Sequence, residues 1–263
     1  MKRLLSGVLA IILLGSLKPA DYTLLKTIEV NGNYFVTDNL GNSFVLSNSN
    51  DINKYDKDGK HIQTQNFKIL GSLTTMDASN PFELYLFYQS QNKLVFLDNM
   101  LSKRGELDFN RGNFVQLTAA ARSYDNGAWI FDLEDLQLKR VDKELKVVAK
   151  SGNVKAFTNA DLNPNFILDN QNHVYLNDPD VGILVFDIFA NYSKTLPLKG
   201  LTNFQIIDKD LYYFKAGKLN KYSLLTYENE EIPLPESEGI LNVRIEKNRL
   251  YVLKDKQLNL YAF

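Results

Sequence analysis

The chain has no cysteine among its 263 residues, and this absence excludes several kinds of protein at once. No disulfide can brace the fold, no lipid-modified cysteine can anchor it, and no thiolate can act as a nucleophile. Histidine is nearly as scarce, because His61 and His173 are the only two. A two-histidine metal site or a serine–histidine–acid set would need them to meet other groups across the fold. We therefore expect no catalytic residues, no cofactor and no metal.

Neither basic nor acidic residues are in clear excess, since the chain has 30 basic and 31 acidic residues. Nucleic-acid-binding domains usually carry a basic excess gathered on one face, so we expect no nucleic-acid partner. Apolar material is plentiful, with 44% hydrophobic residues that include 14 tyrosines and 16 phenylalanines. This composition provides a core and argues against disorder.

The one long apolar run stands at the N-terminus. A Lys-Arg pair precedes Leu4 to Leu14, and small residues follow up to Ala20, which is the order found in export signals. The run is too short to span a bilayer comfortably. The alternatives are an uncleaved N-terminal anchor and a buried apolar segment. We predict a signal peptide over residues 1–20 and a single mature domain over residues 21–263 without a transmembrane span.

A short pattern returns six times along that domain: an aliphatic residue stands four positions before a small or acidic one. The pairs are Ile52/Asp56, Leu94/Asp98, Leu138/Asp142, Ile183/Asp187, Leu219/Ser223 and Leu258/Ala262. Successive second members are 42, 44, 45, 36 and 39 residues apart. Steps of this size are typical of propeller blades.

Short strand-forming runs separated by turn residues surround each repeat. In the first blade they cover Tyr34 to Asp38, Ser43 to Ser47, Ile52 to Asp56 and His61 to Phe67. The sixth blade has three, at Asn242 to Glu246, Leu250 to Lys254 and Gln257 to Phe263. The run from Tyr22 to Val30 is then available as its fourth strand. We predict an all-β, six-bladed propeller of four-stranded blades, closed by pairing of the N-terminal strand with the last blade.

Units such as Tyr34 to Gly59 and Asn165 to Asp187 combine a Gly- or Asn-rich turn, an aromatic-aliphatic strand and an aliphatic-x-x-aromatic-Asp strand. In these units the chain resembles the six-bladed β-propellers of the NHL-repeat and TolB-like group, over essentially the whole mature domain. Ser223 and Ala262 replace the aspartate in the last two repeats. The resemblance implies a scaffold, a ligand-binding module, or one of a few hydrolases or lyases, so it does not fix the activity.

Acidic residues end the predicted innermost strands, at Asp38, Asp77, Asp169, Asp208 and Glu246. They could gather around a metal, but each begins a short turn, where an aspartate bonds the following backbone amides. We interpret them as turn residues. The segments Asp56 to Gly59 and Asn177 to Asp180 contain fragments of calcium loops but lack the distant glutamate that the EF-hand spacing requires.

Departures from the repeat are better candidates for a functional surface. Ala119 to Ala121 replace a bulky inner strand, which would suit a narrow channel, and the connection from Gly152 to Pro164 is long. Loops on a rigid frame concentrate partner contacts, and arginine and aromatic residues favour interface centres. The predicted partner-binding residues are Arg111, Asn113, Phe114, Arg122, Tyr124, Phe157, Asp178 and Asp180.

These features favour a non-catalytic, exported propeller, periplasmic or outer-membrane-associated, that acts as a protein-interaction scaffold or accessory subunit. We expect its partners to be envelope proteins, such as those of a protein-export or outer-membrane assembly complex. The alternatives are a propeller that binds a small molecule or glycan in its central channel, and a lactonase- or lyase-like enzyme. Convergent polar side chains in the channel would favour the alternatives, whereas an apolar or plugged channel would favour the scaffold.

Overall fold

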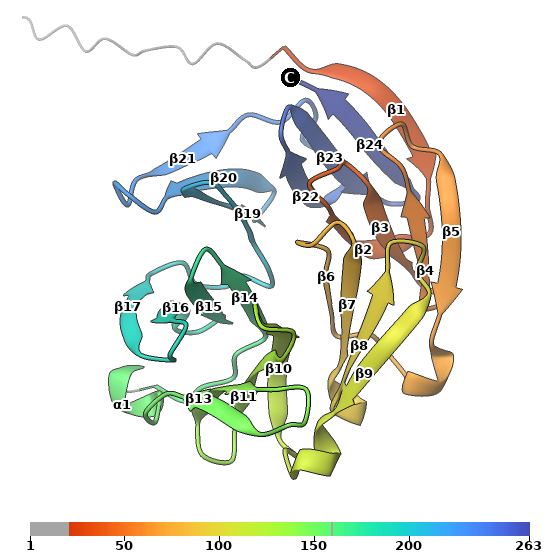
Figure 1. Cartoon of the computed structure of the whole chain (residues 1–263). Helices are drawn as coiled ribbons and strands as arrows, with labels where there is room; N and C mark the ends of the chain where they lie inside the picture. Colours follow the sequence, from red (N-terminus) through yellow and green to blue (C-terminus); the bar gives the residue numbers. More distant parts are fainter. Residues whose placement is uncertain (1–20, 159) are drawn as a thin grey trace, which may run out of the picture.

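Turn residues cut the chain into short antiparallel strands, which assemble as six four-stranded sheets arranged in a ring (Figure 1). The computed structural model describes residues 21–158 and 160–263. The predicted signal peptide, residues 1–20, lies outside the described residues. Within those ranges, no helix has both the length and the apolar character needed to cross a membrane. The predicted six-bladed, all-β propeller is confirmed.

Each blade runs from an innermost strand at the channel to an outermost strand at the rim. Blade 1 consists of β2 (Gly32–Thr37), β3 (Ser43–Ser47), β4 (Asp51–Tyr55) and β5 (His61–Asn66). Blade 2 consists of β6 (Thr75–Asp77), β7 (Glu83–Tyr88), β8 (Lys93–Asp98) and β9 (Lys103–Asp108). Blade 3 consists of β10 (Leu117–Arg122), β11 (Ala128–Asp132), β12 (Gln137–Val141) and β13 (Val147–Lys150).

Blade 4 consists of β14 (Phe166–Asn170), β15 (His173–Asp178), β16 (Gly182–Asp187) and β17 (Tyr192–Leu196). Blade 5 consists of β18 (Gln205–Ile207), β19 (Asp210–Lys215), β20 (Lys218–Ser223) and β21 (Asn229–Ile232). Blade 6 consists of β22 (Ile240–Glu246), β23 (Arg249–Lys254), β24 (Gln257–Ala262) and β1 (Thr23–Glu29). Short helical turns lie between strands, at η1 (Lys68–Leu70), η2 (Gln89–Gln91), η3 (Phe109–Gly112) and α1 (Lys155–Thr158).

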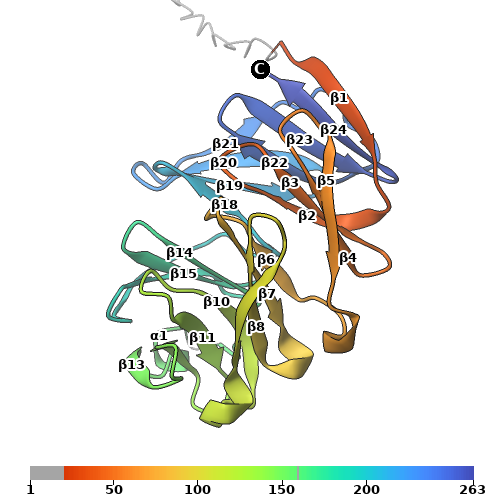
Figure 2. The same cartoon turned by 45° about the vertical axis from the view of Figure 1, so that its right-hand side comes forward.

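The two ends of the chain close the ring. Strand β1 pairs antiparallel with β24, from Thr23 opposite Ala262 to Glu29 opposite Gln257. Figure 2 shows β1 lying along β24 beside the end of the chain. The pairing continues beyond the strands, because the Val30 N–H donates to the Lys256 carbonyl at 3.0 Å. This register confirms the predicted closure, since the first strand supplies the fourth strand of the last blade.

The hydrophobic core is divided into six clusters, one between each pair of neighbouring blades. Successive side chains of a strand point to opposite faces, so one strand serves two clusters. In β11, Trp129 and Phe131 pack toward blade 4, whereas Ala128 and Ile130 pack toward blade 2. A strand covered on both faces needs apolar residues at nearly every position, which explains the continuous apolar runs in the second strands.

The alanines of β10 do not have the role predicted for them, which was to fit a narrow channel. They are not among the residues that line the channel cavity. Ala119 and Ala121 pack against blade 4, and Ala120 packs against blade 2. Their small side chains let β10 contact β14 closely, so they set the spacing of two blades rather than the width of a channel.

The repeated aspartate builds the turn between the third and fourth strands of a blade. In Asp56, Asp98, Asp142 and Asp187, one carboxylate oxygen accepts the backbone N–H groups two and four residues further on, all at 2.8–2.9 Å. In blade 5 the Ser223 hydroxyl accepts the backbone N–H groups two and three residues further on, from Leu225 and Thr226. Ala262 needs no such side chain, because the fourth strand of its blade comes from the other end of the chain.

Antiparallel pairing sorts the loops onto two faces of the disc. The turns between first and second strands and between third and fourth strands lie on one face, here called the mouth face. The turns between second and third strands lie on the opposite side with the connections between blades, and this side is called the connection face.

A polar cavity in the central channel

The central channel contains a cavity of about 390 Å³. Its walls come from the innermost strands of five blades: β2, β6, β14, β18 and β22. Residues just after these strands also line it, including Asn39, Ser79, Asp208 and Lys247 in the turns of the mouth face. The cavity therefore extends from the inside of the ring to that face.

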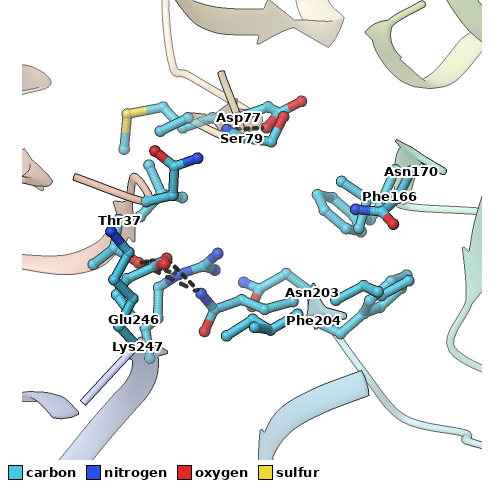
Figure 3. Close-up of a pocket in the computed structure, with 18 of the residues that line it drawn as sticks. Thr37, Asp77, Ser79, Phe166, Asn170, Asn203, Phe204, Glu246 and Lys247 are labelled. Carbon is cyan, nitrogen blue, oxygen red and sulfur yellow. Dashed lines mark hydrogen bonds between the residues drawn. The ribbon is translucent and has the colours of Figure 1, made fainter. Parts of the chain in front are cut away.

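One wall of the cavity is a hydrogen-bond network centred on Glu246. Its Oε1 accepts the Thr37 hydroxyl at 2.7 Å and the Gln205 side-chain amide at 3.0 Å (Figure 3). Gln205, which is 8% exposed, also bonds both backbone groups of Ile245, each at 3.0 Å. These bonds tie blades 1, 5 and 6 together, so the carboxyl group of Glu246 has a fixed position at their junction.

The ionisable groups of this wall, Glu246 and Arg244, have no ion-pair partner within residues 21–158 and 160–263. Burial raises the pKa of Glu246 to about 7, although the bond from Thr37 and the charge of Arg244 act against the rise. Burial also lowers the pKa of Arg244, against the charges of Glu246 and Asp77. The Arg244 Nε donates to the Thr37 hydroxyl at 3.3 Å. Among the described residues, no carboxylate lies within the 4.0 Å ion-pair distance of its guanidinium.

The facing wall, from blades 4 and 5, is largely apolar. Phe166 and Phe204 pack edge to face, with ring centroids 5.2 Å apart, and Leu168 and Ile206 lie beside them. In Figure 3, Phe166 and Phe204 stand across the cavity from Thr37 and Glu246. Asn170 and Asn203 add amide groups next to the two rings. The cavity thus offers charge and hydrogen bonds on one side and an apolar surface on the other.

A smaller cavity of about 230 Å³ adjoins the first and shares Asp77 and Ser79 with it. It is lined by Arg122, Tyr124 and Asp169 from blades 3 and 4. The Arg122 guanidinium lies over the Tyr85 ring at 5.6 Å, and its Nε is buried without a hydrogen-bond partner among the described residues. The polar region of the mouth face therefore extends from the channel toward blade 3.

The turn interpretation of the inner-strand acids is correct for some of them and wrong for others. Asp38 accepts the backbone amides of Leu40 and Asn42, and Asp77 accepts that of Ser79. Asp169 instead bridges two blades, because its Oδ2 accepts the Trp129 indole N–H at 2.9 Å and the Tyr124 backbone N–H at 3.1 Å.

Glu246 also departs from the turn interpretation, since its bonds join three blades. Burial raises the pKa of both exceptions. For Asp169 it does so although the hydrogen bonds from Trp129 and Tyr124 lower the pKa. For Asp208, no bond to a following backbone amide is present among the described residues. Within the described ranges, no group of three or more potential ligands is arranged to hold a metal ion.

The predicted partner-binding residues do not form one surface. Arg111, Asn113, Phe157 and Asp180 are exposed on the connection face. Arg122 and Tyr124 lie in blade 3 at the turn after β10, which belongs to the opposite, mouth face. The Tyr124 hydroxyl accepts a bond from Arg140, whose guanidinium lies 4.8 Å over the ring.

Phe114 and Asp178 are buried, contrary to the expected surface position. Phe114 is 7% exposed, because it belongs to the hydrophobic cluster between blades 2 and 3 with Phe109 and Leu117. Asp178 is 1% exposed, and its carboxylate accepts the backbone amides of Asn163, Asp180 and Val181 at 2.7–3.1 Å. Asp178 therefore holds the long blade 3–4 connection in place instead of meeting a partner or a cation.

Neither histidine reaches the channel. His61 begins the outermost strand of blade 1 and bonds the Thr64 hydroxyl, and His173 begins β15 next to the Gln171 carbonyl. Both are exposed. Sequence reasoning missed Arg244 and Gln205, which stand at the channel wall. The available signal was Gln205 before two isoleucines in β18 and the alternation of polar Asn242, Arg244 and Glu246 with apolar residues in β22.

Comparisons with known proteins bear on the fold alone. Neither family models nor curated protein sequences match the chain. Among solved structures, it is similar to virginiamycin B lyase from Staphylococcus aureus, with a TM-score of 0.65, 11% identity, and coverage of 92% of this chain and all of that one. A catalytically inactive variant of that lyase has been solved with quinupristin and gives a TM-score of 0.59.

Two further solved structures, of proteins other than the lyase, are also similar to this chain. BamB from Moraxella catarrhalis has a TM-score of 0.51 at 11% identity, over 93% of this chain and 98% of that one. The β-propeller domain of Cps50 (Swd1) from Myceliophteria thermophila has a TM-score of 0.64 at 8% identity, over 92% and 99%. At such low identities the likeness establishes a propeller fold shared by proteins of several kinds.

Proposed function

We propose that this protein is an exported, non-catalytic propeller that serves as a protein-interaction scaffold or accessory subunit of a cell-envelope complex. The proposed location, in the periplasm or at the outer membrane, rests on the N-terminal Lys-Arg pair and the apolar run that follows it. The fold likeness to BamB supports an export or outer-membrane assembly role, and membership of the NHL-repeat and TolB-like group belongs to the same proposal.

The observation that carries the scaffold role is a fixed, exposed aromatic side chain on the long connection between blades 3 and 4, next to the outermost strand of blade 4. Phe157 is 44% exposed, and its ring stacks on Tyr192 with centroids 4.9 Å apart and planes 5° apart. A side chain that is already held in place loses little entropy when a partner covers it. Exposed Arg111, Asn113 and Asp180 lie on the connection face and would form a polar surround.

The experiment is affinity purification of the tagged full-length protein from its own host after gentle membrane solubilisation, followed by mass spectrometry. We expect stoichiometric envelope proteins. The variant Phe157→Ser should lose them, whereas Phe82→Ser, which alters a residue 66% exposed on the mouth face, should retain them. Loss with Phe82→Ser alone would move the interface to the mouth face. Recovery of the protein by itself would contradict the stable-subunit role.

The second candidate function is binding of a small ligand in the channel. Its specific support is the cavity of about 390 Å³, which falls in the size range of small-molecule sites and has convergent polar side chains. This is the feature that, from the sequence, we expected of a ligand-binding propeller. It is compatible with the scaffold role, because the exposed Phe157 is not among the residues that line the cavity. A lyase- or lactonase-like activity ranks below both, since neither histidine lines the channel.

A further inference from the structure

Arg244 is a half-buried cation in the channel wall. A guanidinium removed from bulk water is costly unless an opposite charge compensates it. The Nε of Arg244 is occupied by the Thr37 hydroxyl. The part of the chain that the structure describes brings no carboxylate into ion-pair distance of the guanidinium. An anionic group entering the cavity would supply the missing charge.

The neighbouring acids are committed elsewhere. Glu246 has its Oε1 bonded by Thr37 and Gln205, and Asp77 accepts the Ser79 backbone amide at 2.8 Å. Lys247 follows directly on β22, lines the same cavity and is exposed at its mouth. A guanidinium fork and an ammonium group on one side of a cavity form a suitable site for a planar carboxylate.

The acids that remain nearby restrict the charge of the ligand. Asp77, Asp208 and Glu246 all line the cavity. They repel a dianion, such as a phosphate monoester, more strongly than they repel a single carboxylate. The facing wall of Phe166, Leu168, Phe204 and Ile206 suits an apolar body better than a fully hydroxylated one.

We propose that the channel binds a small monocarboxylic acid, with its carboxylate on Arg244 and Lys247 and its apolar body against the wall of blades 4 and 5. This inference rests on the ligand-binding candidate function and names the chemical class of ligand for it. The volume of about 390 Å³ accommodates an acid of roughly the size of a phenylalkanoate.

The test is isothermal titration calorimetry of the full-length protein with matched acids and amides. The probes are 3-phenylpropionate and hexanoate, each compared with its primary amide, and methyl β-glucoside as a neutral sugar. We expect each acid to bind at least tenfold more tightly than its amide, as for a hydrogen bond to a charged group. Arg244→Gln should abolish that difference, and Lys247→Gln should reduce it several-fold.

The matched control is Arg104→Gln, because Arg104 is an arginine in the outermost strand of blade 2, 70% exposed and paired with Asp98 outside the cavity. It should leave acid binding unchanged. If Arg244→Gln does not fold, the exposed Lys247 variant decides the result. Equal binding of acid and amide would overturn the carboxylate site. Binding of the glucoside alone would overturn it too but leave the ligand-binding channel standing, whereas binding of no probe would overturn both and leave the scaffold role intact.

Discussion

At the scale of single residues, burial between the blades shifts the pKa of polar side chains. Glu246 is the clearest case, since its folded-state pKa is about 7 and an unfolded glutamate titrates near 4.3. Because the folded pKa is raised, the folded state binds the proton more strongly. The stability that this provides is present below about pH 4.3 and is lost as the pH rises through about 7.

We therefore predict that Glu246→Gln makes the stability of the protein less sensitive to a rise in pH from acidic to neutral values. Relative to the variant, the wild-type protein should lose up to about 3 kcal/mol of unfolding free energy between pH 4.5 and 8. Urea denaturation at a series of pH values measures this difference. Glu238→Gln, at an exposed loop position, is the control and should give a curve parallel to that of the wild type. Parallel curves for both variants would contradict the assignment.

The repeated aspartate gives a second prediction at this scale. Asp187→Ala removes bonds from the backbone amides of Phe189 and Asn191 and from the Asn191 side chain, at 2.8–2.9 Å. We expect a loss of about 1–2 kcal/mol, seen as a lower melting temperature. Asp255→Ala, in a turn without comparable bonds among the described residues, should change it little. Equal melting temperatures for the two variants would show that these turns do not depend on the carboxylate.

How far single residues could be predicted depends on whether their partners are local. The repeat located Asp56, Asp98, Asp142 and Asp187 correctly because their bonds stay within four residues. Asp169, within the innermost strand of blade 4, instead bonds Trp129 of the preceding blade, which no local pattern reveals. Phe114 was assigned to the surface for the same reason, because only the packing of blades 2 and 3 shows that it is buried.

At the scale of elements, all the strands were predictable and their limits were nearly so. In blade 1, Ser43–Ser47 has the predicted bounds and the strand from His61 ends one residue before the predicted limit, because turn residues mark the ends. The short helix α1 was missed, since four residues give no helical period. Arg122 and Tyr124 were predicted to bind a partner together with residues of the connections, although strand order alone assigns their turn to the mouth face.

The N-terminal strand gives a prediction for an element. A chain that begins at Asn31 lacks β1 and leaves β24 as an unpaired edge, with Leu258 and Leu260 losing the cover of Ile28 and Val30. We expect a sharply lower melting temperature and a tendency to aggregate, compared with a chain that begins at Asp21. Differential scanning calorimetry and light scattering measure both. Superimposable transitions would show that the ring does not depend on this strand.

At the scale of the whole molecule, the closed ring predicts that the position of the chain ends can be changed. Tyr22 packs on Phe263 with ring centroids 5.7 Å apart, so a short linker can join the two ends. A circular permutant that starts at Asn31 and carries residues 21–30 after Phe263 retains every strand pair. We expect its melting temperature to lie close to that of the chain that begins at Asp21. If it behaves like the chain that lacks β1, closure requires the native order of strands.

The pairing of β1 with β24 can form only after the last strand of the chain has been synthesised. Thr27 is synthesised near the beginning of the chain, yet its hydroxyl bonds Asn259, which follows 232 residues later. In an exported chain, the first strand to emerge would wait until nearly the whole polypeptide had followed, with its backbone groups open to other chains. A molecule cut short by premature termination or proteolysis would keep that edge exposed. The β1–β24 pairing is therefore present only in molecules that carry both of these end strands.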